Sequence, residues 1–330
     1  MLNIKKDIKE HKLKGCYLLY GSESYLVKTY EENLKKAALG GGDDIMNSDT
    51  FDDRKLMAKT VIDSAETLPF LAEKRVVIVR DSGFFKQGKK DETEAIAEYI
   101  SNIPETTVIV FSESEVDKRN AAYKAAAKYG YAAEFKTPSE KELIAWVIRE
   151  MKKRGVSIDG KNAAYLIRTV NADMTGAAAE MDKLAAYAGE KGSVDIKAID
   201  EVCVKNPELK IFDMVGAMGA KNAPKAIDIY NNMLLYNESP MGILAMITRQ
   251  FRLMYECALM LDKGENITSI AAKLGIRDYM ARDFCRQSGN FSISRLRQAL
   301  NACLEADVGI KSGRIKDSLA VELILMEYSV

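Results

Sequence analysis

The stretch "CYLLYGSESYLVKTY", residues 16–30, has the outline of a phosphate-binding loop: an apolar run, a glycine-led turn, then a helical segment that carries Lys28 and Thr29. The order of strand, turn and helix predicts the first unit of an α/β domain. A working loop of this kind reads G-x-x-x-x-G-K-[ST]. Its backbone N–H groups surround the phosphates, the lysine reaches the β- and γ-phosphates, and the hydroxyl holds Mg²⁺.

The residues at the positions of this motif do not match it. Counting from Gly21, the second glycine and the lysine fall on Leu26 and Val27, and Lys28 and Thr29 come one residue late. One residue along a helix turns a side chain by about 100°, so Lys28 and Thr29 would point away from a phosphate. The missing glycine matters as much, because a backbone approaches phosphate most easily where there is no side chain.

The magnesium-binding part of such a site is also missing. It would be an apolar strand followed by adjacent carboxylates. The run "VVIV" (76–79) is followed by Arg80 and a lone Asp81, and "VIVF" (108–111) by the alternating "SESE". Glu23 adds a negative charge inside the loop. The sequence therefore predicts the architecture of a nucleotide-binding domain whose site has been lost, with Gly21, Lys28 and Thr29 as its remnant.

Beyond this loop, short β-branched runs alternate with helical periods as far as about residue 135. Such alternation predicts a doubly wound parallel sheet. The expected strands are 16–20, 45–51, 75–80, 106–111 and 131–135, and the expected helices between them are 24–38, 54–66, 91–102 and 118–129. From "KTPSEKE" (136–142) the pattern is helical to the end, with a break at Pro207. We therefore expect an α/β domain at 1–137, a small helical domain at 138–206 and a larger helical domain at 207–330.

Composition excludes several classes of function. The 330 residues carry 48 basic and 48 acidic side chains, so no overall charge favours nucleic acid or an anionic membrane. No apolar run is long enough to span a bilayer, and the charged N-terminus has no secretion signal, which predicts a cytoplasmic protein. The only histidine is His11, and the five cysteines lie far apart, so we expect no metal site and reduced thiols.

Four stretches together resemble one family, the delta subunit of the bacterial DNA polymerase III clamp loader. They are "YLLYGSESYLVK" (17–28), "ETLPFLAEKRVVIVRD" (66–81), "TVIVFSESEVDKR" (107–119) and "LRQALNACLEADVGIKSGRIKDSLAVELIL" (296–325). Each motif alone is loose, but the four occur in order and at suitable spacings. The resemblance extends over essentially the whole chain.

This resemblance implies an AAA+-like parallel α/β domain, a small helical lid domain and a C-terminal helical collar domain. It implies a subunit without catalysis or cofactor of its own, an accessory of a DNA-directed DNA polymerase (a nucleotidyltransferase) that acts in DNA replication. Its partners would be the sliding clamp (beta), which it opens, the ATPase subunits (tau/gamma), delta-prime, and primer-template DNA. Two alternatives are a divergent AAA+ ATPase that uses Lys28, and a delta-prime-like loader paralogue. Against the paralogue stand the missing phosphate-binding loop and the missing zinc-binding cysteine cluster.

Family members place an apolar wedge between the second helix of the domain and its third strand. Carried over by position, the wedge consists of Leu68, Pro69, Phe70 and Leu71. Pro69 limits the freedom of the backbone, so less entropy is lost on docking, and an exposed Phe flanked by Leu suits an interface anchor. The alternative is that Phe70 and Leu71 pack under the strand that they precede.

Basic residues gather modestly near the C-terminus. Arg282 and Arg286 belong to this group, which exceeds the acidic residues of positions 277–316 by four charges (8 − 4). A run of this size is usually the solvated face of a helix. The other interpretation is that Arg282 and Arg286 lie near DNA.

Overall fold

The protein is described here by a computed structural model that covers residues 2–40, 45–53, 55–190 and 192–329. The chain forms two compact units, Met1–Ser139 and Glu140–Val330, and each is considered by itself. Within the described ranges, no helix is both long and apolar enough to cross a membrane.

The first unit is built on a sheet of five parallel strands. They are β1 (Cys16–Tyr20), β2 (Ser48–Phe51), β3 (Arg75–Arg80), β4 (Thr107–Glu113) and β5 (Tyr131–Glu134), in the order β2-β3-β4-β1-β5. The register pairs Leu18 with Phe111 and Val77 with Ile109. Strands β3 and β4 consist mainly of buried β-branched residues because helices cover both faces of the sheet.

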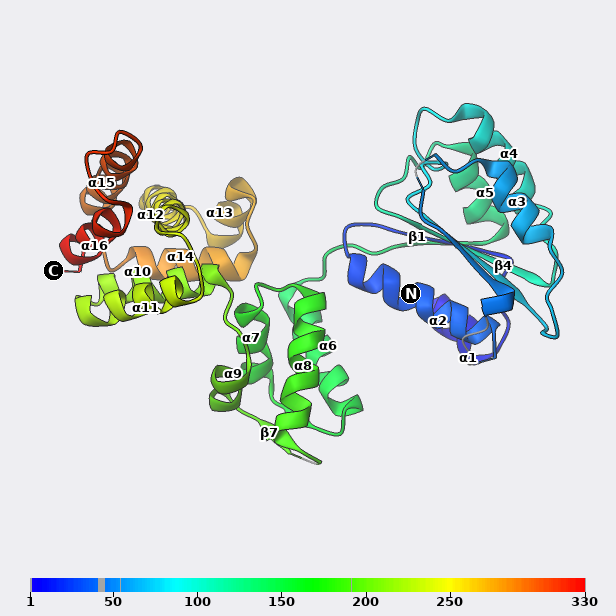
Figure 1. Cartoon of the computed structure of the whole chain (residues 1–330), viewed down its shortest axis with the longest axis horizontal. Helices are drawn as coiled ribbons and strands as arrows, with labels where there is room; N and C mark the ends of the chain where they lie inside the picture. Colours follow the sequence, from blue (N-terminus) through cyan, green and yellow to red (C-terminus); the bar gives the residue numbers. More distant parts are fainter. Residues whose placement is uncertain (1, 41–44, 54, 191, 330) are drawn as a thin grey trace. The chain divides into compact units, whose positions relative to one another are not determined.

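Two layers of helices enclose this sheet (Figure 1). Helices α1 (Leu2–Lys9) and α2 (Ser24–Ala38) cover one face, and α3 (Ala58–Glu66), α4 (Lys90–Ile100) and α5 (Ala121–Tyr129) cover the other. Successive residues of β1 point to opposite faces, so Leu18 packs with the core under α3–α5 and Leu19 with the core under α2. The doubly wound α/β fold predicted from the sequence is confirmed.

One helix of this unit was not expected, and several boundaries differ from the expected ones by a few residues. Helix α1 was not predicted, because it is short and half of its eight residues are charged. The expected strand 45–51 begins with a 3-10 turn, η1 (Ile45–Asn47), and only its second half joins the sheet. The expected helix 54–66 starts at Ala58, and residue 54 lies outside the described residues.

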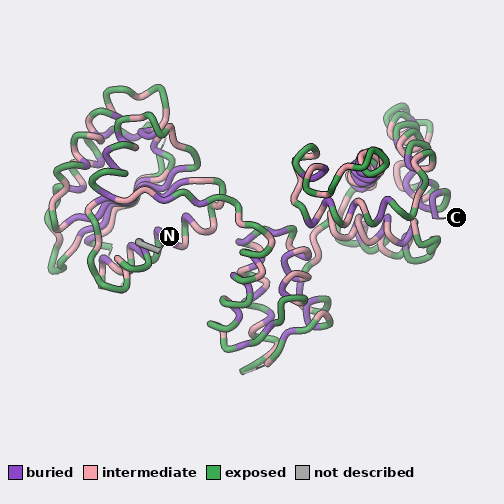
Figure 2. The backbone as a smooth tube through the Cα atoms, turned by 180° about the vertical axis from the view of Figure 1, so that it is seen from behind, coloured by how far each residue is buried: buried purple, intermediate pink, exposed green. Residues whose placement is uncertain are grey.

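The second unit is almost wholly helical, and the hydrophobic core within residues 211–328 gathers around the long helix α12 (Pro240–Asp262). Figure 2 shows the buried positions on the inner sides of its helices. The other helices are α6 (Glu140–Lys153), α7 (Gly160–Thr169), α8 (Met174–Ala188), α9 (Ile196–Val202), α10 (Pro207–Gly219), α11 (Ala223–Leu235), α13 (Ile267–Leu274), α14 (Asp278–Ser288), α15 (Ile293–Lys311) and α16 (Asp317–Glu327).

One expectation for this unit was wrong, since the chain is not helical throughout after residue 136. Strands β6 (Ser157–Ile158) and β7 (Ser193–Val194) form a short parallel pair. Two residues are too few to produce a detectable alternation. Pro207 occupies the first turn of α10, where its missing N–H costs nothing, and the Asn206 side chain caps the helix by accepting from the Leu209 N–H at 2.9 Å.

Candidate functional site

The loop that follows α3 presents apolar side chains to solvent. Leu68, Phe70 and Leu71 are 77%, 59% and 93% exposed, and Pro69 is half-buried. The alternative that Phe70 and Leu71 pack under β3 is therefore wrong. An exposed Phe between two exposed Leu residues is unusual at a surface that contacts nothing, and such clusters commonly mark protein-binding sites.

The backbone of this loop is held at Phe70 by the side chain of Asn47. The Phe70 N–H donates to Asn47 Oδ1 at 2.5 Å, and Asn47 Nδ2 donates to the Phe70 carbonyl at 2.8 Å. Asn47 is completely buried at the end of η1. Leu71, next in the chain, has a φ of +52°, a left-handed conformation that L-residues with large side chains rarely adopt. The backbone of the loop is therefore held in an uncommon conformation, although its apolar side chains are exposed to solvent.

A buried arginine braces the same region. The Arg75 guanidinium donates to the carbonyls of Ser64, at 2.9 Å, and Met46, at 3.3 Å. It also forms an ion pair with Asp49. Ser64 belongs to the last turn of α3, and Met46 directly precedes Asn47 in η1. The Arg75 side chain therefore connects the end of α3 to the turn that carries Asn47.

The turn between β1 and α2 is where a nucleotide phosphate would bind in a working site. Gly21 has a φ of +131°, and a Cβ there would lie 2.3 Å from the Phe135 carbonyl oxygen, so only glycine fits. The N–H of Gly21 donates to the Glu113 carbonyl at 3.2 Å, and the N–H of Glu23 to the Phe135 carbonyl at 3.1 Å. Both groups are thus used inside the domain instead of facing a ligand.

The other two residues of the remnant loop are on α2. The Thr29 hydroxyl donates to the Tyr25 carbonyl at 2.7 Å, one helical turn back. Lys28 is exposed and lines the edge of the neighbouring cavity. The Thr29 hydroxyl hydrogen is thus directed back along its own helix.

A cavity of about 440 Å³ lies beside this turn, and an internal ion pair occupies its wall. Arg80 contacts the buried Glu31 carboxylate through both Nε and a terminal nitrogen, at 3.1 and 2.6 Å. The Ser112 hydroxyl donates to the same carboxylate at 2.6 Å. The hydrogen bond to Glu31 raises the pKa of Arg80. Of the two cationic side chains that line the cavity, Arg80 is therefore already neutralised.

A second buried carboxylate lines this cavity. Glu113 is 2% exposed, and one of its oxygens accepts from the Ser82 N–H at 3.0 Å and from the Ser82 hydroxyl at 2.5 Å. Its Oε2 has no hydrogen-bond partner, and burial raises the pKa of the group to about 6. With Glu31, Asp81 and Glu115, the cavity has four carboxyl side chains against two cationic ones, which disfavours a polyphosphate.

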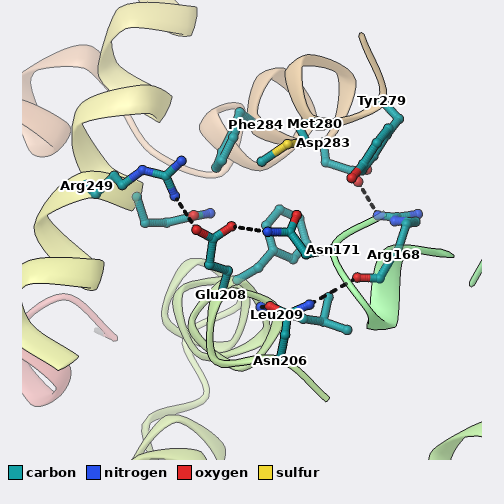
Figure 3. Close-up of a pocket in the computed structure, with 12 residues that line it drawn as sticks. Arg168, Asn171, Asn206, Glu208, Leu209, Arg249, Tyr279, Met280, Asp283 and Phe284 are labelled. Carbon is teal, nitrogen blue, oxygen red and sulfur yellow. Dashed lines mark hydrogen bonds and ion pairs between the residues drawn. The ribbon is translucent and has the colours of Figure 1, made fainter. Parts of the chain in front are cut away.

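A smaller pocket in the second unit, about 60 Å³, is closed by ion pairs between helices (Figure 3). Glu208 of α10 accepts from Arg249 of α12 at 3.1 Å and from Asn171, in the turn after α7, at 3.1 Å. Arg168 of α7 pairs with Asp283 of α14. These links brace the helices against one another. Sequence reasoning missed them, because the partners are 37 to 115 positions apart.

Both arginines suggested to lie near DNA are paired with acidic residues. Arg286 contacts Asp283 at 3.0 Å, one turn away on α14, and Arg282 pairs with Glu140 at the start of α6. Their side chains are still 69% and 50% exposed. A contact of Arg282 and Arg286 with DNA stays a prediction.

Two family models match the chain. The model for the DNA polymerase III delta subunit matches residues 17–136, and the model for the C-terminal domain of that subunit matches 208–328. Together they cover well over half of the chain. The first match contains the exposed loop and the remnant nucleotide turn, and the second contains helices α10–α16.

Full-length relatives agree with this assignment. The DNA polymerase III subunit delta of Bacillus subtilis (strain 168) is 25% identical over 99% of this chain and 96% of its own length. A probable DNA polymerase III subunit delta of Aquifex aeolicus (strain VF5) is 21% identical over 79% of this chain and 76% of its own. The solved structure of a Bacillus subtilis DNA clamp loader delta protein has the same fold, with a TM-score of 0.72 at 24% identity and 99% coverage of both chains. This chain therefore belongs to the DNA polymerase III delta subunit family, whose members are accessory, clamp-loader subunits of that polymerase.

Proposed function

We propose that this subunit binds the sliding clamp through a wedge loop, residues 68–71, and holds one interface of the ring open while the clamp is loaded on primed DNA. The observation that carries the proposal is the exposure of Phe70 and Leu71 on a loop whose backbone is fixed by Asn47. Opening a ring requires a partner that binds the opened form better than the closed one. A rigid apolar wedge can supply that difference by filling a pocket at the interface.

The energetics favour such an anchor. Transferring exposed Phe and Leu side chains into an apolar pocket is worth about 1.5–3 kcal/mol each. Because the loop is already ordered, little backbone entropy is lost when it docks. Aromatic residues at the centre of an interface commonly dominate its binding energy. Phe70 and Leu71 are thus expected to provide most of the affinity, and Leu68 and Pro69 to line the rim.

We further propose that the subunit has no ATPase activity of its own. The N–H groups of Gly21 and Glu23 donate to backbone carbonyls of the same unit, the Thr29 hydroxyl donates to its own helix, and the Glu31–Arg80 pair occupies the cavity wall. In an ATP-driven loader, the homologous ATPase subunits (tau/gamma) would then hydrolyse the nucleotide, and delta-prime would complete the assembly.

The helical region 207–330 is our candidate for the collar that contacts these loader subunits. Helix α16 carries Leu319, Leu323 and Met326 at helical spacing, and they are 47%, 52% and 53% exposed. The opposite side of α16 is buried in the core of the unit. A helix that is apolar on both sides usually packs against a second surface. The division at residues 137/138 and 206/207 is part of this proposal.

Ring opening is tested most simply with clamps already loaded on circular DNA. If the subunit holds an interface open, adding the full chain without nucleotide should speed the release of clamps from the circle. Boiled protein and linear DNA, from which clamps slide off unaided, are the controls. Release that depends entirely on added ATP, or no release at all, would contradict the proposal.

A further inference from the structure

We infer that Asn47 is a positioning residue for the wedge loop: its buried side-chain amide holds Phe70 in the orientation in which Phe70 and Leu71 enter the clamp. This inference rests on the proposed function and names a residue that acts behind the contact surface. Asn47 lies 23 positions before Phe70 and is fully buried, so it would not touch a partner itself.

The geometry fixes one residue from both sides. Asn47 uses its oxygen for the Phe70 N–H and its nitrogen for the Phe70 carbonyl, the same exchange that a pair of antiparallel strands makes. Because the two bonds involve the peptide groups before and after the Phe70 Cα, they fix both peptide planes. Only a side-chain amide provides a donor and an acceptor at this spacing without carrying charge.

The neighbouring residue shows why such a hold is needed. Leu71 has a φ of +52°, a conformation that persists in large L-residues only where the surroundings impose it. Its side chain is 93% exposed, so its own packing does not impose it. The two hydrogen bonds from Asn47 to Phe70, the preceding residue, are therefore what restrains the backbone at Leu71. Without them, the loop would relax, and the fraction of molecules able to bind would fall together with the apparent affinity.

The experiment compares Asn47→Ala with Asn120→Ala in the full chain. Asn120 is a matched control in the same unit: its Nδ2 donates to the carbonyls of Phe84 and Lys86 at 3.1 and 3.2 Å, and its Oδ1 caps α5. Both variants lose side-chain hydrogen bonds to loop backbone, but only Asn47→Ala frees the wedge loop.

Two measurements follow for each variant. Binding to the immobilised sliding clamp of the same organism should weaken about 10- to 100-fold for Asn47→Ala, the loss expected for two hydrogen bonds, mainly through a slower association rate. Exchange of the Phe70 amide hydrogen in the free chain should rise at least ~10-fold. Asn120→Ala should leave both quantities near wild type. Asn47→Ser serves as the second variant if Asn47→Ala does not fold.

The outcomes separate this inference from the proposed function. If Phe70→Ala loses clamp binding but a folded Asn47→Ala or Asn47→Ser binds as tightly as wild type, the positioning role is refuted and the wedge stands. Equal losses for Asn47→Ala and Asn120→Ala would also refute it, because general destabilisation would then explain both. If Phe70→Ala binds like wild type, the proposed function itself fails.

Discussion

Replacing Glu113 by Gln should stabilise the first unit at neutral and alkaline pH. Glu113 lies at the end of β4 with 2% of its surface exposed, and its Oε2 has no hydrogen-bond partner. Glutamine keeps an oxygen that can accept from the N–H and hydroxyl of Ser82, but it cannot ionise. The change therefore removes a buried charge and little else.

The magnitude follows from the pKa of this group. Burial raises the pKa of Glu113 from 4.5 to about 6, which corresponds to about 2 kcal/mol. The folded state then holds the proton more tightly than the unfolded state, so the stabilising contribution is present below about pH 4.5 and is lost as pH rises through about 6. An unpartnered amide nitrogen at the Oε2 position will offset part of the gain. We expect Glu113→Gln to be about 1 kcal/mol more stable than wild type at about pH 8, and about 1 kcal/mol less stable below about pH 4.5, where wild-type Glu113 is neutral and only the cost of the unpartnered amide remains.

The assay must report on the first unit alone. The only tryptophan, Trp146, is on α6 in the second unit, so its fluorescence does not follow this sheet. Hydrogen exchange of the β4 amides, such as those of Ile109 and Val110, measures the unfolding free energy of the unit directly. A stability difference that does not change between pH 4.5 and 8, or a variant that is less stable at every pH, would refute the reasoning.

Two further predictions concern nucleotide and assembly. Calorimetric titration of the isolated subunit with Mg-ATP should show no micromolar binding, because the phosphate-facing groups are already used; micromolar affinity that Lys28→Ala abolishes would contradict this. Replacing Leu319 and Leu323 by Asp should remove the subunit from the reconstituted loader while clamp binding stays intact, since both side chains are about half exposed and the core side of α16 is unchanged. Normal co-purification of that variant with the ATPase subunits would exclude α16 as a contact.

Much of the fold could be predicted from local patterns. The bounds of β1 and α2 agree with the expected ranges, because strong periodicity and the glycine turn between them mark these elements. Strands β3 and β4 were visible as apolar runs. Helix α1 and the β6–β7 pair were missed, since a short charged helix and two-residue strands carry little periodic signal.

The candidate site was less accessible to sequence reasoning. An apolar residue beside a strand has the same local pattern whether it is buried or exposed, so the pattern alone could not decide between the two places for Phe70. The hydrogen bonds that hold the loop backbone come from Asn47, which lies 23 positions before Phe70, and no local motif links the two residues. Similarly, the Arg80–Glu31 pair joins residues 49 positions apart. Such contacts depend on how the strands are ordered in the sheet.

The most direct test of clamp binding is the double replacement of Phe70 and Leu71 by Ala. One sample is used for both thermal unfolding and binding to the immobilised clamp. Both side chains are largely exposed and Ala keeps the backbone bonds to Asn47, so the unfolding midpoint should stay within about 2 °C of wild type. Loss of a docked aromatic anchor is commonly worth ~2–4 kcal/mol, so the affinity should fall about 30- to 1,000-fold. A variant with a wild-type midpoint and undiminished clamp affinity would show that the clamp is bound elsewhere.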